Sequence, residues 1–290
     1  MKLNEIYMRD PFIFVEGDTC FLVGSTDKQV WGGKASGFLG YKSKDLINFE
    51  GPFVLFENTD DFWADENFWA PELHKIDDKY YLFASFFVQG KKRASQVLIA
   101  NTPFGQYKPS KKPFTPSEWS CLDATFYEEN GHRYAIFCYE WLDVHDGRIC
   151  IGEFNEDFTE LNNVKELFKA SDAKWAKGFN ANGVTNYVCD GPFIYKTESG
   201  RLLMLWSSHG EGGYCQGISC SDNGIFGEWK QLDKPLLSSD SGHGMIFEFK
   251  GQKYLIVHTF NSKAGLERPS IFKVKEENNM IVLDGEVREK

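Results

Sequence analysis

The stretch Asp10-Pro-Phe-Ile-Phe-Val-Glu-Gly-Asp-Thr-Cys-Phe-Leu-Val-Gly-Ser25 contains two short apolar segments that flank a Gly-Asp pair. Alternating apolar residues on both sides of turn-forming residues indicate an antiparallel β-hairpin. A polar residue opens the first segment, and aromatic or β-branched residues fill both. A unit this regular calls for a search for further copies before any other architecture is considered.

The same unit recurs four more times along the chain. The copies begin at Ala70, Asp123, Asp190 and His243, so the steps between starts are 60, 53, 67 and 53 residues. A weaker third strand is expected after each hairpin, at 37–42, 96–100, 148–154, 215–220 and 270–274. Five copies of a roughly four-stranded antiparallel unit predict an all-β, five-bladed β-propeller over residues 1–290 as a single domain. A two-layer β-sandwich with coincidental hairpins is the alternative.

Composition narrows the classes of function. Hydrophobic residues make up 42% and charged residues 26% of the chain, which is typical of a globular protein. The net charge of −10 disfavours a nucleic-acid partner, and the longest apolar runs are too short to cross a membrane. The opening residues lack the apolar segment of a secretory signal, and the seven cysteines show no CxxC spacing, so we expect a cytoplasmic protein.

Two local patterns carry predictions of their own. The segment 162–170 is the best candidate for a short helix in a chain that otherwise predicts strands. The basic run Lys91-Lys92-Arg93 follows Gly90, and we interpret it as a solvated loop tip.

The repeat also predicts a functional site. In a propeller the first strand of every blade lines the central axis, so the residues that open the copies gather at one mouth. Asp10, Asp123, Asp190 and His243 are expected in one pocket, with Trp69 at the remaining blade. Neighbouring carboxylates drive one another's pKa values apart, which allows one to act as a base and another as an acid. Glycoside hydrolysis uses such a pair of carboxyl groups, one as a general acid and one as a base.

Aromatic residues near these strand starts could supply apolar faces for a sugar. The candidates are Trp69, Phe68, Trp31 and Trp141. Each polar residue also has a structural alternative. Asp10 precedes a proline, Asp123 could cap a turn, Asp190-Gly191-Pro192 could form a tight turn, and a lone histidine such as His243 is as often structural as functional.

The ordered motifs resemble glycoside hydrolase family 43, the five-bladed propeller glycosidases acting on arabinose- and xylose-containing glycans. The resemblance covers essentially the whole chain and rests on Arg9-Asp10-Pro11, Trp69-Ala70-Pro71-Glu72, Leu122-Asp123-Ala124-Thr125-Phe126, Asp190-Gly191-Pro192 and Gly242-His243-Gly244. It implies that Asp10 is the general base, that Asp123 tunes and positions the acid, and that Asp190 is the general acid. It further implies that His243 helps to hold a central cation or water, and that Arg268 contacts the sugar.

The resemblance implies an inverting glycoside hydrolase that removes terminal α-L-arabinofuranosyl or β-D-xylosyl residues from small plant-type oligosaccharides. It implies no required cofactor, with a structural Ca²⁺ near the axis as the one metal to look for. This chain departs from the family at the acid, where Asp190 stands in place of the usual Glu. A carbohydrate-binding propeller without turnover is therefore the alternative function.

Overall fold

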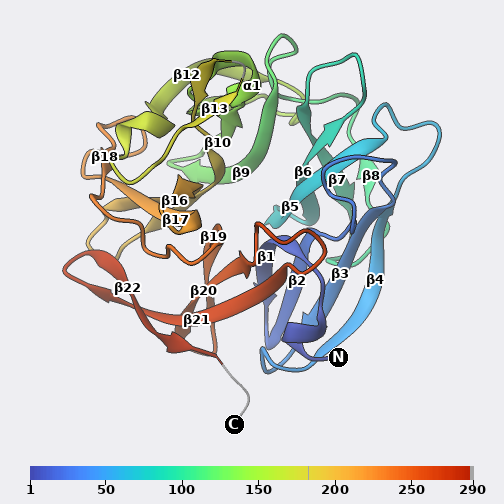
Figure 1. The fold of residues 1–290 in the computed structure, drawn as a ribbon. Helices are drawn as coiled ribbons and strands as arrows, with labels where there is room; N and C mark the ends of the chain where they lie inside the picture. The colour runs from blue at the N-terminus through green and yellow to red at the C-terminus, as the bar shows by residue number, and fades with distance from the viewer. Residues whose placement is uncertain (182, 288–290) are drawn as a thin grey trace.

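The computed structural model describes residues 1–181 and 183–287, and five four-stranded antiparallel sheets surround a central axis (Figure 1). The first blade consists of β1 (Arg9–Glu16), β2 (Thr19–Ser25), β3 (Gly37–Ser43) and β4 (Phe49–Glu57), and the second of β5 (Glu66–Ile76), β6 (Lys79–Phe87), β7 (Ala94–Ala100) and β8 (Lys108–Pro109). The third consists of β9 (Cys121–Glu129), β10 (His132–Tyr139), β11 (Arg148–Phe154) and β12 (Leu161–Lys169), and the fourth of β15 (Asp190–Lys196), β16 (Leu202–Gly210), β17 (Gly213–Ser221) and β18 (Lys230–Gln231). The fifth consists of β19 (Ser241–Phe249), β20 (Gln252–Thr259), β21 (Arg268–Glu277) and β22 (Met280–Glu286). The predicted five-bladed β-propeller is confirmed, and the two-layer sandwich is excluded.

A few short elements lie outside the blades. They are two 3-10 turns, η1 (Leu3–Glu5) and η2 (Ala170–Asp172), the one-turn helix α1 (Trp141–Val144), and a small hairpin of β13 (Phe179–Ala181) and β14 (Val184–Asn186). The hairpin forms its own two-stranded sheet between the third and fourth blades, which explains why that step of the repeat is the longest.

The helix predicted for 162–170 is wrong. Leu161–Lys169 is the outermost strand of the third blade and pairs with β11. Two register shifts interrupt this pairing, so the apolar residues do not alternate as they would along a regular strand. The irregular spacing of the apolar residues resembled a weak helical period. The segment forms a strand because it pairs with β11.

The hydrophobic core lies between adjacent blades. Four clusters of buried side chains fill the space from blade to blade; Phe83 of the second blade and Phe126 of the third, for example, have ring centroids 5.8 Å apart. Trp206 and Phe83 are completely buried. The high aromatic content therefore serves mainly to fill wedge-shaped gaps between twisted sheets.

The innermost strand of every blade is irregular at the same place. Each of these strands contains a residue with a left-handed backbone, and a register shift accompanies it. These residues are Asp10 (φ 49°), Ala70 (φ 46°), Asp123 (φ 55°), Gly191 (φ 52°) and His243 (φ 52°). Four of the five are not glycine, so the backbone is strained at these positions and must be held by its surroundings.

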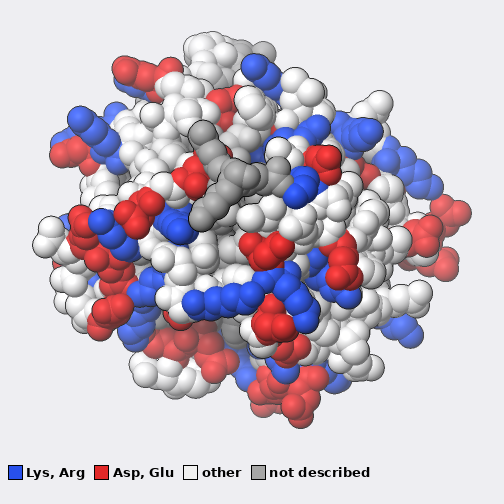
Figure 2. Space-filling view, turned by 90° about the horizontal axis from the view of Figure 1, so that it is seen from below, with Lys and Arg blue, Asp and Glu red and all other residues white. Residues whose placement is uncertain are grey.

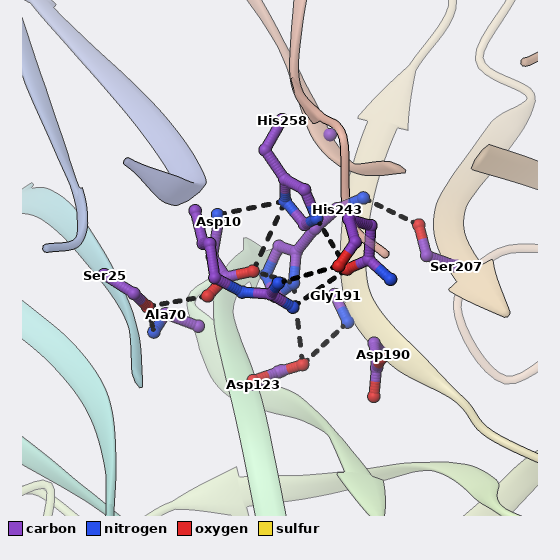
Figure 3. A network of polar contacts seen from close by, with 12 residues as sticks. Asp10, Ser25, Ala70, Asp123, Asp190, Gly191, Ser207, His243 and His258 are labelled. Atoms are coloured by element: carbon purple, nitrogen blue, oxygen red, sulfur yellow. Dashed lines mark hydrogen bonds and ion pairs between the residues drawn. The ribbon is translucent and has the colours of Figure 1, made fainter. Parts of the chain in front are cut away.

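A ring of hydrogen bonds holds these residues. The backbone N–H of each one donates to a side chain of the preceding blade: Ala70 to Ser25 Oγ (2.8 Å), Asp123 to Ser85 Oγ (2.8 Å), Gly191 to Asp123 Oδ2 (3.1 Å), His243 to Ser207 Oγ (2.8 Å) and Asp10 to His258 Nδ1 (3.1 Å). Figure 3 shows most of this ring as dashed lines. The ring orients the innermost strands around the axis.

A buried ion pair joins the first blade to the last. Arg9 donates to Glu267 Oε1 at 2.9 Å and to Asn261 Oδ1 at 2.9 Å. The side chain of Glu267 is fully buried, and that of Arg9 nearly so. Each four-stranded sheet consists of strands that follow one another in the chain, so the first and last blades do not share a sheet. Side-chain contacts such as this ion pair therefore hold the first and last blades together.

The surface and the cysteines agree with the expectations for a globular protein. All seven cysteines are buried and carry free thiols. Positive and negative side chains are interspersed on the face shown in Figure 2. Within residues 1–181 and 183–287, no helix has the length and apolar character needed to cross a bilayer.

Replacing Glu267 by Ala should destabilise the protein strongly, because the Arg9 guanidinium would stay buried without its partner. We expect the free energy of unfolding to fall by about 3–5 kcal/mol. Asp233→Ala is the matched control, since Asp233 forms an ion pair with Lys174 in which both side chains are exposed. It should cost less than about 1 kcal/mol in denaturant titrations followed by tryptophan fluorescence. Equal losses in the two variants would contradict the proposed role of the buried pair.

Candidate active site

A cavity of about 540 Å³ is lined by residues from all five blades. Seven of the residues predicted from the sequence line it: Asp10, Trp31, Trp69, Asp123, Trp141, Asp190 and His243. The structure therefore brings the three candidate carboxylates, the histidine and three of the four candidate aromatics to one place.

Two predicted substrate contacts lie elsewhere. Phe68 is 2% exposed and packs in the core against Phe86, with ring centroids 4.9 Å apart. Arg268 does not line the cavity; its guanidinium donates to the Glu267 carbonyl oxygen and lies over the ring of Tyr7. Phe68 and Trp69 are adjacent in a strand and point to opposite faces, so only the tryptophan reaches the cavity.

Asp10 is buried and both of its carboxylate oxygens are held. Oδ2 accepts a hydrogen bond from Ser25 Oγ at 2.6 Å, and Oδ1 lies 3.1 Å from His243 Nδ1. Ser25 thus contacts Asp10 and also the backbone of Ala70, which fixes the carboxylate relative to the second blade. Figure 3 shows this arrangement from close by.

Asp10 and His243 form a charged pair. Burial alone would raise the pKa of Asp10, but His243 and Arg9 outweigh it and lower that pKa well below the ordinary value. Burial alone would lower the pKa of His243, but the charges of Asp10 and Asp123 raise it to about 9. At neutral pH, Asp10 is therefore a carboxylate and His243 an imidazolium.

His258 provides a neutral counterpart on the other side of Asp10. Burial, together with the charge of Arg9, lowers its pKa to about 3. The neutral ring accepts the Asp10 backbone N–H at Nδ1 and lies 3.0 Å from Asn261 Oδ1 at Nε2. This pattern requires the proton on Nε2.

Asp123 acts on the backbone next to Asp190. Its Oδ2 accepts the Gly191 N–H at 3.1 Å and lies 3.7 Å from His243 Nδ1. Gly191 is required here, because a Cβ atom would lie 2.7 Å from the His243 ring and the backbone is left-handed. Burial, assisted by the charges of Asp190 and Asp10, raises the pKa of Asp123 to about 8 despite the opposing charge of His243.

Asp190 is offset by one residue from the other predicted ring members. The left-handed residue of its strand is Gly191, whereas in the other three blades it is Asp10, Asp123 or His243 itself. Asp190 pairs with Ser207 as Arg9 pairs with Ser25, so it takes the place of a residue on the wall of the cavity. In Figure 3 it stands apart from the dashed network. The expectation that all polar strand starts are in register was wrong for this residue.

Tyr214 is the direct partner of Asp190. The phenol donates to Asp190 Oδ2 at 2.9 Å, and the ring stacks on His258 with centroids 5.4 Å apart. Burial raises the pKa of Asp190, while His243 and the hydrogen bond from Tyr214 act in the opposite direction. Within the described residues no hydrogen bond joins Asp190 to Asp10, so the two carboxyl groups open separately onto the cavity.

Aromatic side chains form two walls of the cavity. Trp31 is 62% exposed and packs edge-on against Trp69 at 5.7 Å. Trp141 packs edge-on at 5.0 Å against Phe179, which comes from the extra hairpin. Exposed aromatic faces beside buried carboxylates suit a ligand with both apolar and hydroxyl-bearing surfaces.

Several cavity residues were not predicted from the sequence, and three of them bear on the chemistry of the site. Arg93, interpreted as part of a solvated tip, is 6% exposed and lies 3.4 Å from Glu140. Glu140 and Tyr214 were not singled out at all. Arg93 follows two exposed lysines, and the only signal was that a strand begins at the next residue, Ala94.

The axis was tested for a metal ion. No group of three or more His, Cys, Asp or Glu side chains among the described residues is arranged to hold one. His243 directs Nδ1 at Asp10 Oδ1, 3.1 Å away, so this nitrogen is engaged in the pair. Ca²⁺ takes about six to eight oxygen ligands. The residues at the axis therefore do not fit a Ca²⁺ ion bound directly by side chains, and that ion stays a prediction.

Carboxyl groups whose pKa values are driven apart within one cavity are typical of glycoside hydrolases. The family model described as glycosyl hydrolases family 43 matches residues 4–274. The protein belongs to this family.

Individual proteins are similar to this chain over most of its length. The crystal structure of an endo-arabinase from Bacteroides thetaiotaomicron is 34% identical, covers 96% of this chain and 98% of its own, and superposes with a TM-score of 0.88. The extracellular exo-α-(1→5)-L-arabinofuranosidase ArbA of Cellvibrio japonicus is 20% identical over 89% of this chain and 80% of its own. The xylosidase/arabinosidase 43A of Humicola insolens is 22% identical over 94% of both.

The charged state of His243 can be measured directly by NMR titration of its imidazole. We expect the ring to stay protonated until the pH approaches about 9. Because the folded pKa is raised, the stabilisation from this pair is complete below about pH 6.5 and is lost as the pH rises through 9. A midpoint near 6.5 would show that the pairing with Asp10 is not formed in solution.

Proposed function

We propose that this protein is an inverting glycoside hydrolase that releases terminal α-L-arabinofuranosyl or β-D-xylosyl units from small plant-type oligosaccharides. One observation carries the proposal: Asp10, ionised at neutral pH, and Asp190, whose pKa is raised, open onto the same cavity without contacting each other. The names of the relatives support the substrate class, since two are an arabinase and an arabinofuranosidase and the third is a xylosidase/arabinosidase. The cytoplasmic location rests on the sequence expectation alone.

In this mechanism Asp10 accepts a proton from a water molecule whose oxygen attacks the anomeric carbon. The glycosidic C–O bond breaks on the opposite face, and Asp190 gives its proton to the departing oxygen. The water oxygen ends on the face opposite to the leaving group, so the anomeric configuration inverts. His243 stabilises the ionised form of the base before the reaction.

Asp123 and Tyr214 act as positioning residues for the acid. Asp123 holds the Gly191 N–H, and Tyr214 holds one oxygen of Asp190, so the carboxyl group is fixed from both sides. Asp is shorter than the usual Glu by one carbon–carbon bond, about 1.5 Å. A fixed orientation limits the loss of reach that a shorter acid brings, because proton transfer needs hydrogen-bond distance to the leaving oxygen.

The shorter acid also supports a second candidate, a carbohydrate-binding propeller without turnover. The hydrogen bond from Tyr214 favours the ionised form of Asp190, which weakens it as an acid. Binding of arabino- or xylo-oligosaccharides in calorimetry, with no hydrolysis of any furanoside or pyranoside tested, would favour this candidate.

Asp10→Asn should abolish hydrolysis of 4-nitrophenyl α-L-arabinofuranoside and β-D-xyloside. The variant loses the buried partner of His243 and should unfold at a lower temperature, so rates are measured at a temperature where circular dichroism shows it to be folded. Loss of a general base at the reacting water should lower kcat by about a hundredfold or more. Proton NMR of the first sugar released by the unaltered protein should show the inverted anomer. A retained product would contradict the mechanism, and full activity of the variant would contradict the assignment of the base.

The pH dependence of kcat/KM should be bell-shaped. Asp10 must be ionised, and its lowered pKa extends activity to pH values below the ordinary aspartate value of about 3.9. Asp190 must be protonated, and its raised pKa moves the alkaline limb upward. Asp190→Ala should lose the alkaline limb and should retain more activity on aryl glycosides than on natural linkages, since an aryl oxygen leaves without protonation. An unchanged alkaline limb would exclude Asp190 as the acid.

A further inference from the structure

A buried ion pair lies at the edge of the cavity between the second and third blades. Arg93 Nε is 3.4 Å from Glu140 Oε2, and Arg93 Nη1 donates to Asn67 Oδ1 at 3.3 Å. Both charged side chains are only 7% exposed, yet both residues line the cavity. The Arg93 guanidinium also lies 4.1 Å from the ring centroid of Trp69.

One oxygen of Glu140 has no hydrogen-bond partner among residues 1–181 and 183–287. Oε2 accepts from Arg93 and from Ser120 Oγ at 2.9 Å, whereas Oε1 accepts no hydrogen bond from any described residue. Some polar side-chain atoms of the described residues are fully enclosed and lack a partner, but Glu140 Oε1 is not one of them. This oxygen is therefore accessible and not sealed in the core. A carboxylate oxygen able to accept a hydrogen bond therefore opens where Glu140 lines the cavity.

The surroundings of this oxygen resemble a sugar-binding site in their chemistry. Trp69 is held rigidly on one side by Arg93 and by its own hydrogen bond to the Val30 carbonyl oxygen at 2.8 Å. Trp141 and Leu142, which follow Glu140 directly, also line the cavity. A carboxylate flanked by apolar surfaces matches a pentose ring, whose hydroxyls are donors and whose C–H faces are apolar.

Stability alone does not account for the pair. A buried ion pair contributes little to stability compared with apolar residues of the same volume. A ligand hydroxyl that donates to the accessible Oε1 would give this oxygen a hydrogen-bond partner.

The position of the pair separates it from the bond that is cut. Glu140 follows the second strand of its blade and Arg93 precedes the third strand of its own, whereas Asp10, Asp123 and His243 lie on innermost strands. Figure 1 shows the innermost strands nearest the axis and the later strands farther out. No hydrogen bond or ion pair links Glu140 or Arg93 to those three residues.

We propose that Glu140, oriented by Arg93, binds hydroxyl groups in a second sugar subsite that is radially outside the catalytic carboxylates. Its ligand is a neutral pentose unit of the same oligosaccharide, next to the sugar whose bond is cut. The proposal rests on the proposed function for the identity of the ligand as a pentose oligosaccharide. Specificity for chain length then depends on this pair.

The test is calorimetric binding in the Asp10→Asn background, where turnover is removed. The probes are α-1,5-linked L-arabinotriose and methyl α-L-arabinofuranoside, which lacks the second sugar. Glu140→Gln should weaken binding of the triose more than binding of the methyl glycoside, by a factor of about ten, because a hydrogen bond to a charged acceptor is lost. Glu166→Gln is the matched control, since Glu166 pairs with Arg148 on the same blade with both side chains about one-third exposed.

Glu140→Gln leaves Arg93 buried without a full partner and could unfold the protein. The double variant Arg93→Met, Glu140→Met removes both charges at similar volume, which buried pairs often tolerate. It should show the same selective loss for the triose. Equal losses for both probes, or no loss for either in a folded variant, would overturn the subsite.

The outcome is separable from the proposed function. Selective loss of triose binding in a protein that hydrolyses nothing would keep the subsite and contradict the hydrolase. Hydrolysis of aryl arabinofuranosides with no selective loss would keep the hydrolase and contradict the subsite.

Discussion

The arrangement at the axis depends on one constraint, which is the left-handed backbone at the same point of all five innermost strands. Each strained residue is held because its N–H donates to a side chain of the neighbouring blade. The acceptors occupy equivalent positions in four blades, namely Ser25, Ser85, Ser207 and His258. The third blade has Cys138 there, a poor acceptor, and the Asp123 carboxylate takes over its task. The hydrogen bond from the Gly191 N–H to Asp123 thus both holds the strained backbone and positions the residue next to the candidate acid, Asp190.

The same constraint separates the charges. Asp10, Asp123 and His243 are themselves the left-handed residues of their strands. Both carboxylates lie within 4 Å of His243 Nδ1, so the protonation states of the three groups are strongly coupled. Asp190 precedes its left-handed residue and contacts Tyr214 instead. A base whose pKa is lowered and an acid whose pKa is raised can therefore face one cavity without a direct contact between them.

Closing the ring of blades has a similar double role. The Arg9–Glu267 pair joins the first and last blades, and Arg9 also lowers the pKa values of Asp10 and His258. Arg9 lies over Trp31 at 4.6 Å, which connects the closure to one aromatic wall of the cavity. Stability of the ring and electrostatics of the site thus share a single guanidinium.

The sequence alone determined the number of blades, because hairpin periodicity and turn residues are local properties that survive in any context. It also determined that polar residues opening the repeats would meet at the axis. Only the tertiary structure decided that Asp190 is offset by one residue, that Arg93 is buried against Glu140, and that Phe68 faces the core. The offset of Asp190 depends on a register shift and on Ser207 and Tyr214 in other strands, and the burial of Arg93 depends on Glu140, 47 residues away; neither leaves a local pattern in the sequence. The direction of Phe68 follows from alternation with Trp69 once the strand is packed against the core. Protonation states were likewise undetermined, because burial and neighbouring charges act only once the blades are assembled.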